Sequence, residues 1–218
     1  MTKVITGGTG LIGSAFSEGV KLSSKRDLRD YDKAKFAISM YKPNVVIHCA
    51  AKVGGVGANM EFPADFFMDN IRMNTNVIQA CHELKIPKLV SFLSTCVFPD
   101  NVEYPLDETK IELGPPHPSN FAYAYAKRMA DVQIRAFNKQ YGTKYFSVIP
   151  CNVYGPNDNY SLEVGHVIPM LIHKCYLAKK NRKTFEVWGD GTPLREFVYS
   201  KDVANIVDLL IQKYKGTD

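Results

Sequence analysis

Long hydrophobic runs are missing from this sequence, and their absence is the first limit on the class of protein. No stretch reaches the roughly 18 consecutive apolar residues that a membrane-spanning helix needs. The N-terminal residues read as a short strand followed by a glycine turn, which is not the composition of a secretory signal peptide. We therefore expect a soluble, cytoplasmic protein with no membrane partner.

Paired cysteines and concentrated basic charge are missing as well. The five cysteines include no Cys-x-x-Cys pair, so we expect neither a disulfide framework nor a metal site. The net charge of +5 is scattered, without the aromatic-interleaved basic stripe of a nucleic-acid-binding surface. This modest positive balance suits an anionic small ligand and equally suits an ordinary solvated surface.

The sequence does contain an alternation of short apolar runs and longer helical patterns, which is typical of a parallel sheet covered by helices. With 218 residues, 45% of them hydrophobic, the chain is long enough for one domain and part of a second. The predicted fold class is α/β: a Rossmann-type doubly wound parallel sheet with an incomplete smaller C-terminal substrate lobe. The nucleotide-binding domain with the catalytic residues is expected at 1–150, and the partial lobe at 151–218.

The same patterns predict individual elements. Strands are expected at 3–6, 44–50, 88–94 and 144–150, and helices at 64–84 and 122–141. Beyond residue 150 we expect strands at 185–188 and 196–199, a helix that begins near Pro169, and a last helix capped by Asp202. Only residues 14–20 remain for the first crossover helix, which is either minimal or short of some residues.

A glycine turn follows the first strand. Thr6-Gly7-Gly8-Thr9-Gly10-Leu11-Ile12-Gly13 places Gly-x-x-Gly-x-x-Gly between a predicted strand and a predicted helix. Gly7 allows the tight turn, Gly10 lets backbone approach a pyrophosphate, and Gly13 permits close packing of helix on strand. An ordinary turn is the alternative, but the flanking strand and helix favour a dinucleotide site at a helix N-terminus.

The end of the second strand indicates which dinucleotide is bound. NAD sites place an Asp or Glu there for the ribose hydroxyls, whereas this sequence has Ser23-Ser24-Lys25-Arg26. Hydroxyls and cations suit a 2′-phosphate, which a carboxylate would repel. We therefore predict NADP(H), against the alternative that these residues only begin a surface turn.

Three residues predict the acid/base site of a reductase. Tyr123 and Lys127 are four apart on a predicted helix and so face the same side. An adjacent ammonium stabilises a phenolate and would lower the pKa of the tyrosine. Ser94 follows a buried strand at the carboxyl edge of the sheet, where open α/β folds bind ligands, and it can donate a hydrogen bond to a substrate carbonyl.

With these motifs in place, the chain resembles the extended short-chain dehydrogenase/reductase family along its whole length. Within that family it is most similar to the branch that converts GDP-4-keto-6-deoxy-D-mannose to GDP-L-fucose. Members continue well past residue 218, and the resemblance also implies a homodimer. Besides Tyr123 to Lys127, the resemblance rests on the motifs AAKVGG at 50–55, STCVFP at 94–99, NVYGPNDN at 152–159, HVIP at 166–169 and WGDGTPLREF at 188–197.

The resemblance implies epimerisation at C3 and C5 of the keto sugar, followed by NADPH-dependent reduction at C4. Cys96 and His166 match the pair that removes and returns the carbon-bound protons, since thiol and imidazole both titrate near neutrality. Tyr123 and Ser94 would stabilise the oxygen at C4 and then assist the reduction as proton donors.

The resemblance also implies the binding residues. For GDP-sugar these are Asn152, Lys174, Trp188 and Arg195, with Lys174 in place of the arginine expected in some members. For NADP(H) they are Gly7, Gly8, Thr9, Gly10, Leu11, Ile12, Gly13, Ser24, Lys25, Ala50, Ala51, Phe92, Leu93, Ser94, Thr95, Lys127, Pro150, Cys151, Asn152, Val153 and His166.

Two alternatives stay open. One is another NAD(P)-dependent nucleotide-sugar epimerase or dehydratase, although a dehydratase would want an acidic pair where Cys96-Val97 stands. The other is a non-catalytic NADP-binding scaffold, which the incomplete lobe favours and the intact Tyr123, Lys127, Cys96 and His166 disfavour.

Overall fold

The core of the molecule is a five-stranded parallel sheet in the order β2-β1-β3-β4-β5, as seen in a computed structural model that describes residues 1–163, 165–192 and 194–216. The strands are β1 (Lys3–Thr6), β2 (Val20–Leu22), β3 (Val45–His48), β4 (Lys88–Phe92) and β5 (Lys144–Val148). The chain runs outward from β1 to β2 and then crosses back to β3 on the other side of β1. Such a reversal opens a crevice at the carboxyl ends of the strands, where α/β sheets bind ligands.

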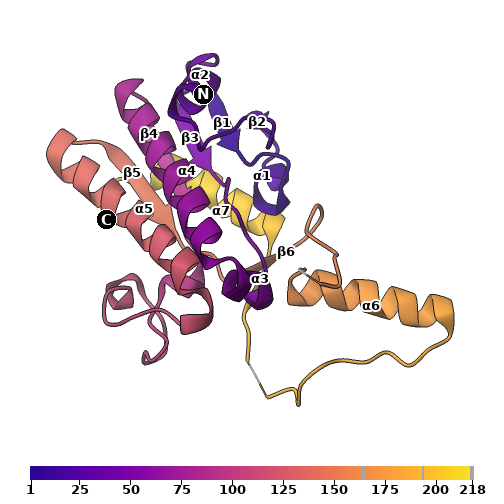
Figure 1. Ribbon diagram of the computed structural model, residues 1–218. Coiled ribbons are helices and arrows are strands. Elements are labelled where there is room, and N and C mark those ends of the chain that lie inside the picture. The colour runs from indigo at the N-terminus through magenta and orange to yellow at the C-terminus, as the bar shows by residue number, and fades with distance from the viewer. Residues whose placement is uncertain (164, 193, 217–218) are drawn as a thin grey trace.

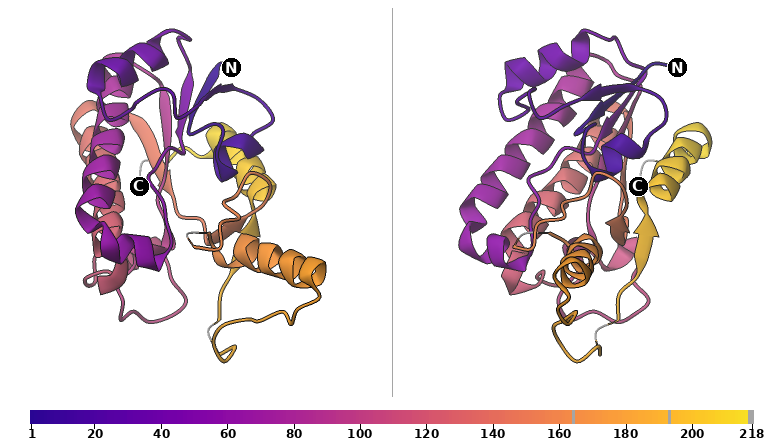
Figure 2. Two further views of the ribbon diagram at one scale, coloured as in Figure 1. Left: turned by 45° about the vertical axis from the view of Figure 1, so that its right-hand side comes forward. Right: turned by 90° about the vertical axis from the view of Figure 1, so that its right-hand side faces the viewer.

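Helices cover both faces of this sheet, as Figures 1 and 2 show. On one face lie α2 (Tyr31–Ser39), α4 (Pro63–Glu83) and α5 (Phe121–Tyr141), whose apolar side chains pack on Val4, Val46 and Leu89. On the other face α1 (Leu11–Ala15) and α7 (Ser200–Lys213) pack beside Ile5, Val45 and Ile47. The sheet is therefore buried on both sides, and the predicted doubly wound α/β fold is confirmed.

A second, two-stranded parallel sheet joins β6 (Asn152–Tyr154) to β7 (Phe197–Tyr199). Between them α6 (Val167–Asn181) points away from the main sheet (Figure 1). The division at residue 150 stays a prediction, but α7, which comes from the second segment, covers one face of the first segment's sheet. The remaining elements are α3 (Val56–Glu61) and three 3₁₀ turns at Thr95–Val97, Glu108–Lys110 and Pro118–Asn120.

Most of the strongly patterned elements occur where the sequence places them, and the differences have physical reasons. Residues 185–188 form no strand, because this segment is exposed and no neighbouring chain pairs with it. Asp202 lies in the first turn of α7 but does not cap it, since the helix already begins at Ser200 with Tyr199 as N-cap. The sequence patterns also missed α2, α3 and β6, which are short or only weakly amphipathic. The first crossover helix, Leu11–Ala15, begins within the glycine motif and not at residue 14, and its five residues make a minimal crossover; whether residues are missing here stays a prediction.

Candidate functional site

The glycine turn after β1 has the geometry that a close-packed nucleotide loop requires. Gly7 has φ +63°, and a β-carbon there would lie 2.7 Å from the backbone nitrogen of Ala50. At Gly13 a β-carbon would lie 2.3 Å from the carbonyl oxygen of Gly7. The turn is thus pressed between the start of α1 and the end of β3, which brings the predicted cofactor residues of both segments together. Thr9 and Gly10, by contrast, are exposed at the mouth of the turn.

The loop after β2 presents the predicted 2′-phosphate ligands to solvent. Ser24 and Lys25 are exposed, and neither side chain bonds to another described residue. Asp27, two residues after Lys25 in the same loop, is neutralised by Arg29, whose Nε lies 2.9 Å from the carboxylate. That pairing lowers the pKa of Asp27 to about 2. The exposed Lys25 is therefore available at this end of the crevice, with the Asp27 carboxylate already paired.

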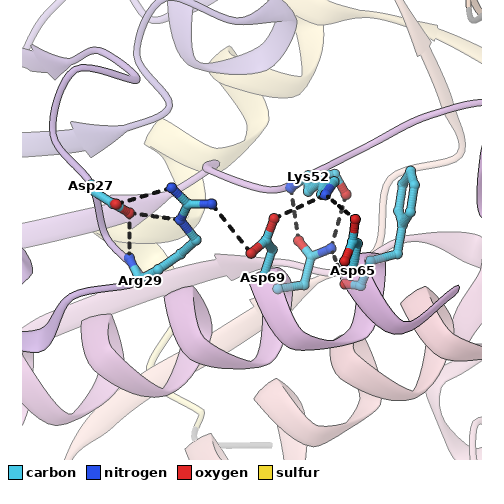
Figure 3. A network of polar contacts seen from close by, with 7 residues as sticks. Asp27, Arg29, Lys52, Asp65 and Asp69 are labelled. Carbon is cyan, nitrogen blue, oxygen red and sulfur yellow. Dashed lines mark hydrogen bonds and ion pairs between the residues drawn. The ribbon is translucent and has the colours of Figure 1, made fainter. Parts of the chain in front are cut away.

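Arg29 also belongs to a network of ion pairs that holds two loops against α4. No spacing pattern in the sequence predicted this network. Asp69 on α4 lies 3.4 Å from Arg29 Nη1 and 3.1 Å from Lys52 Nζ, and Asp65 lies 3.6 Å from the same ammonium (Figure 3). The Asn70 side chain adds bonds to the backbone N–H and carbonyl of Lys52, each 2.9 Å long. The loops after β2 and β3, on either side of the glycine turn, are thereby held to one helix.

The catalytic candidates Ser94, Cys96, Tyr123 and Lys127 gather where β4 ends against α5. Lys127 Nζ donates to the Phe92 carbonyl oxygen at 2.7 Å and lies 5.8 Å from the centre of the Tyr123 ring. Ser94 is within hydrogen-bonding reach of the Cys96 thiol, and Cys96 lies close enough to Tyr123 that a thiolate there would raise the pKa of the tyrosine. Arg128 Nε, one residue along the helix, donates to the Val97 carbonyl oxygen at 2.6 Å. The helix that carries the tyrosine is thus bonded directly to the loop that carries the serine and cysteine.

Burial sets the protonation of this cluster. Burial raises the pKa of the Tyr123 hydroxyl, so the prediction that Lys127 lowers the pKa of this tyrosine is wrong. Burial also raises the pKa of the Cys96 thiol and lowers the pKa of Lys127 to about 8. A phenol that keeps its proton at neutral pH is a proton donor, and the ammonium beside it would stabilise the phenolate left behind.

A buried hydrogen-bond chain connects the glycine turn to the catalytic helix. The His48 ring on β3 bonds through Nδ1 to Thr6 Oγ1 at 2.7 Å and through Nε2 to Asn74 Oδ1 at 3.0 Å. Asn74 in turn donates to the Ala126 carbonyl oxygen of α5 at 3.2 Å. Burial lowers the pKa of His48 to about 3, so the ring is neutral and can both donate and accept.

The remaining sugar and cofactor candidates lie on the second sheet and α6. Asn152 Nδ2 donates to the Glu196 carbonyl oxygen at 2.9 Å, which ties β6 to the start of β7. His166 is the N-cap residue of α6, and its Nδ1 lies 3.6 Å from Asp158. Among the described residues it forms no hydrogen bond or ion pair with Tyr123 or Cys96. Pro150, Cys151 and Val153 follow β5 and are partly buried around the junction of the two sheets.

Two of the predicted sugar-nucleotide residues meet. Lys174 Nζ of α6 lies 3.4 Å from the centre of the Trp188 ring, a cation–π contact, and that ring is 75% exposed. Arg195 donates to the neighbouring Leu194 carbonyl oxygen and is otherwise open to solvent. Pro193, within the same motif, lies outside the described residues. An exposed ring and two cations are suited to a nucleotide base and a pyrophosphate.

Within residues 1–163, 165–192 and 194–216, no group of three or more His, Cys, Asp or Glu side chains is placed to hold a metal ion. In the same residues no helix combines the length and the apolar character that crossing a bilayer would take.

Comparisons with known proteins agree with this geometry. The model of the family described as "NAD dependent epimerase/dehydratase family" matches residues 3–218. The GDP-L-fucose synthase of Dictyostelium discoideum is 48% identical over 98% of this chain and 71% of its own length. A probable GDP-L-fucose synthase of Drosophila melanogaster is 44% identical over 100% of this chain and 74% of its own. Among solved structures, a GDP-L-fucose synthetase from Naegleria fowleri bound to NADP superposes with a TM-score of 0.92 at 45% identity, covering 99% of this chain and 74% of that one.

Proposed function

The chain belongs to the NAD dependent epimerase/dehydratase family, within it to the GDP-L-fucose synthases, and on that basis we propose how its own residues carry out the reaction. It converts GDP-4-keto-6-deoxy-D-mannose to GDP-L-fucose by epimerisation at C3 and C5 and reduction at C4, with NADP(H) as cofactor. The observation that carries this proposal is the junction of α5 with the end of β4, where Tyr123, Lys127, Ser94 and Cys96 lie together.

The residues around the glycine turn fit NADP(H). Side chains are excluded at Gly7 and Gly13, so backbone N–H groups are left to face phosphates. Ser24 and Lys25 are exposed beyond β2, while the nearest carboxylate is paired with Arg29. When bound, the cofactor supplies the hydride for C4.

Tyr123 and Ser94 act on the oxygen at C4. Because the Tyr123 hydroxyl keeps its proton, it donates that proton to the oxygen as the carbonyl becomes an alcohol. Ser94 donates a hydrogen bond to the same oxygen and fixes its position. Lys127, a buried ammonium 5.8 Å from the tyrosine ring, then stabilises the phenolate until it regains a proton from solvent.

Cys96 and His166 carry out the two epimerisations. The Cys96 sulfur, once deprotonated, removes the proton from C3 or C5, and Tyr123 and Ser94 stabilise the resulting enolate at the C4 oxygen. The imidazolium of His166 returns a proton to the opposite face of the same carbon. Asp158 raises the pKa of His166, which favours its protonated form, whereas burial raises the pKa of the Cys96 thiol, so the thiol must lose its proton before it acts as the base.

The nucleotide of the substrate is held by the second segment. Trp188 stacks on the base or a sugar ring, and Lys174 and Arg195 pair with the pyrophosphate. Asn152 lies between this region and the cofactor, at the start of β6.

Two finer properties belong to the same proposal. A homodimer forms through α4 and α5, because both helices expose large apolar side chains, among them Met68, Phe121, Tyr125 and Val132. The protein works in the cytoplasm, which its five free cysteines suit. Analytical ultracentrifugation tests the dimer, and a sedimentation coefficient of a monomer at micromolar concentration would exclude it.

The activity is tested with the purified chain, NADPH and GDP-4-keto-6-deoxy-D-mannose. We expect NADPH consumption and GDP-L-fucose as product. In Tyr123→Phe turnover is expected to fall by at least 100-fold while NADPH binding is kept, because only the proton-donating hydroxyl is lost. Full activity of that variant, or the absence of any product from the unmodified chain, would refute the proposal.

A further inference from the structure

Asp158 is a buried carboxylate that the epimerisation described above leaves without a role. It lies in the turn after β6, and its side chain is 4% exposed. One oxygen, Oδ1, accepts a bond from the N–H of Asn159 at 2.7 Å, while Oδ2 is buried and has no hydrogen-bond partner among the described residues. Leaving a carboxylate half satisfied in the interior is costly, so a charged donor is needed nearby.

The His166 ring is the cationic group placed against this carboxylate, on the side of Oδ1 and not of the unpartnered Oδ2. Its Nδ1 lies 3.6 Å from Asp158 Oδ1, an ion-pair separation that is longer than a hydrogen bond. Such contacts in catalytic sites often shorten only when the substrate is bound. The ring is half exposed, and its Nε2 bonds to none of the described residues. With Nδ1 turned toward the carboxylate, Nε2 is the nitrogen left for substrate.

The turn that carries Asp158 is fixed at both of its ends. Asn157 Nδ2 donates to Ser14 Oγ of α1 at 3.1 Å, beside the glycine turn. Gly155, with φ +152°, lies so close to the start of α7 that a β-carbon would be 2.3 Å from Ser200 Oγ. The carboxylate is therefore held by the same scaffold that positions the cofactor residues, although His166 is on α6.

The surroundings of Asp158 strengthen its effect on the ring. The residue borders a cavity of about 360 Å³ that is lined mainly by Tyr154, Pro156, Ile168, Pro169 and Ile172. Apolar walls lower the local dielectric constant, so one charge acts more strongly on another. Within the described residues, Asp158 is the ionisable group that acts on His166; the nearby His173 is bonded to the Tyr160 carbonyl oxygen instead.

We propose that Asp158 is a positioning residue for the epimerisation: it orients the His166 ring through Nδ1 and keeps a proton on Nε2 for transfer to carbon. The step balances as a proton shift. The Cys96 sulfur takes the proton from carbon, His166 Nε2 gives one to the opposite face, and the ring is left neutral with its Nδ1–H on Asp158, which stays ionised throughout. Solvent then restores the Nε2 proton and takes the one from sulfur. This inference rests on the proposed function for one point only, namely that the carbon that loses and regains a proton belongs to the keto sugar.

The test compares Asp158→Asn with Glu163→Gln, which removes an exposed carboxylate from the same loop. The first readout is the His166 imidazole signal in a pH titration by NMR, assigned from its absence in His166→Gln. We expect the pKa of His166 to fall in Asp158→Asn and to stay in Glu163→Gln. The raised pKa of His166 follows from its interaction with the Asp158 carboxylate and is opposed by burial, so removing the carboxylate leaves only the lowering effect.

The second readout is the exchange of substrate C–H protons with deuterated solvent, measured without NADPH. In Asp158→Asn we expect this exchange to slow by at least tenfold at neutral pH, with its alkaline limb moved to lower pH, while NADPH binding is kept. Glu163→Gln should exchange like the unmodified chain. A titration of His166 unchanged in Asp158→Asn, together with exchange within twofold of normal, would overturn the inference.

A measurement on the unmodified protein covers the case in which Asp158→Asn does not fold. The ¹⁵N shifts of neutral His166 distinguish its tautomers, and the proton should reside on Nδ1, facing Asp158. A proton on Nε2 would overturn the inference. If the unmodified chain exchanges no substrate proton, the proposed function fails, but the titration and the tautomer still decide the relation of Asp158 to His166.

Discussion

The Lys127 ammonium donates a hydrogen bond to the carbonyl oxygen of Phe92, across 2.7 Å at the end of β4. This side chain is 2% exposed, and burial lowers its pKa to about 8 from an ordinary value of 10.5. A buried cation with a single carbonyl partner lowers the stability of the fold, so its presence here is explained by its chemistry.

Lys127→Met should therefore stabilise the folded chain while removing its activity. The folded pKa lies below the unfolded one, so the charged lysine destabilises the fold at all pH values below about 8, and this effect disappears as pH rises to 10.5. The shift of the Lys127 pKa from 10.5 to about 8 corresponds to about 3 kcal/mol of destabilisation, which Lys127→Met removes. The variant also loses the hydrogen bond to Phe92, which contributes about 1 kcal/mol. We expect a net gain of about 2 kcal/mol in the free energy of unfolding in urea at pH 7. The exposed Lys144→Met is the control, and a less stable Lys127→Met would contradict the argument.

Gly13→Ala tests the packing of the glycine turn. The added β-carbon would meet the Gly7 carbonyl oxygen at 2.3 Å and the Gly8 α-carbon at 2.8 Å, and backbone atoms cannot move aside without displacing the turn. We expect the dissociation constant of NADPH, measured by fluorescence titration, to rise at least tenfold, with a loss of about 1–3 kcal/mol in stability.

The matched control for that variant is Gly57→Ala on α3. A β-carbon at Gly57 would have no heavy atom within 4 Å, so it should improve helix stability slightly and leave NADPH binding unchanged. Equal NADPH affinity in both variants would mean that the turn at Gly13 is not part of the cofactor site.

The fold was predictable from local patterns, whereas much of the site was not. Runs such as that of β3 are buried on both faces and hence continuously apolar, so they can be recognised without knowledge of their neighbours. The segment at 185–188 has a similar composition but no strand beside it, and composition cannot reveal the missing partner. The pairs Arg29–Asp69, His48–Asn74 and His166–Asp158 join residues from different elements, so no helical or strand spacing predicts them.

Protonation was the other property that the spacing of Tyr123 and Lys127 could not provide. The i, i+4 relation places the two side chains on one helix face, and from this alone a lowered tyrosine pKa is expected. In the structure Lys127 is buried and Tyr123 is partly buried, and desolvation raises the pKa of the tyrosine and lowers that of the lysine, which favours the neutral form of each. Burial depends on the strands and loops packed over the helix, which local spacing does not describe.

His48→Gln tests the neutral histidine between Thr6 and Asn74. The folded pKa of His48 is about 3, below its unfolded value, so its contribution to stability is complete above about pH 6.5 and is lost as pH falls toward 3. Between pH 6.5 and 5 the unmodified chain should lose about 2 kcal/mol through this residue, at 1.36 kcal/mol per pH unit.

The measurement for His48 is urea denaturation of both proteins at pH 7 and pH 5. The stability advantage of the unmodified chain over His48→Gln should shrink by about 2 kcal/mol between these pH values. Contributions from other groups, including the raised pKa of His166, cancel in the difference because both proteins contain them. An advantage that does not change with pH would show that His48 titrates in the folded chain as it does in the unfolded one.

Asp69→Asn tests the network of ion pairs that holds the loops after β2 and β3 against α4. Its carboxylate lies within 3.4 Å of Arg29 and 3.1 Å of Lys52, and each partly exposed pair contributes up to about 0.5 kcal/mol. The variant should lose about 1 kcal/mol at pH 7 by urea denaturation. The matched control, Asp65→Asn, removes a 66% exposed carboxylate that lies 3.6 Å from Lys52 alone. Its free energy of unfolding should fall by only about a few tenths of a kcal/mol.

The pH dependence separates this charge effect from a packing effect of the Asp69 substitution. The pKa of Asp69 is lowered by its bonds to Lys52 and Arg29 against the opposing effect of burial. The pairs therefore stabilise the fold above the unfolded pKa of about 3.9, and this contribution disappears as pH falls through the folded pKa. The difference between the unmodified chain and Asp69→Asn should vanish at low pH and shrink in 1 M salt, where screening weakens exposed pairs. A difference that persists in both conditions would mean that Asp69 holds the loops by packing rather than by charge.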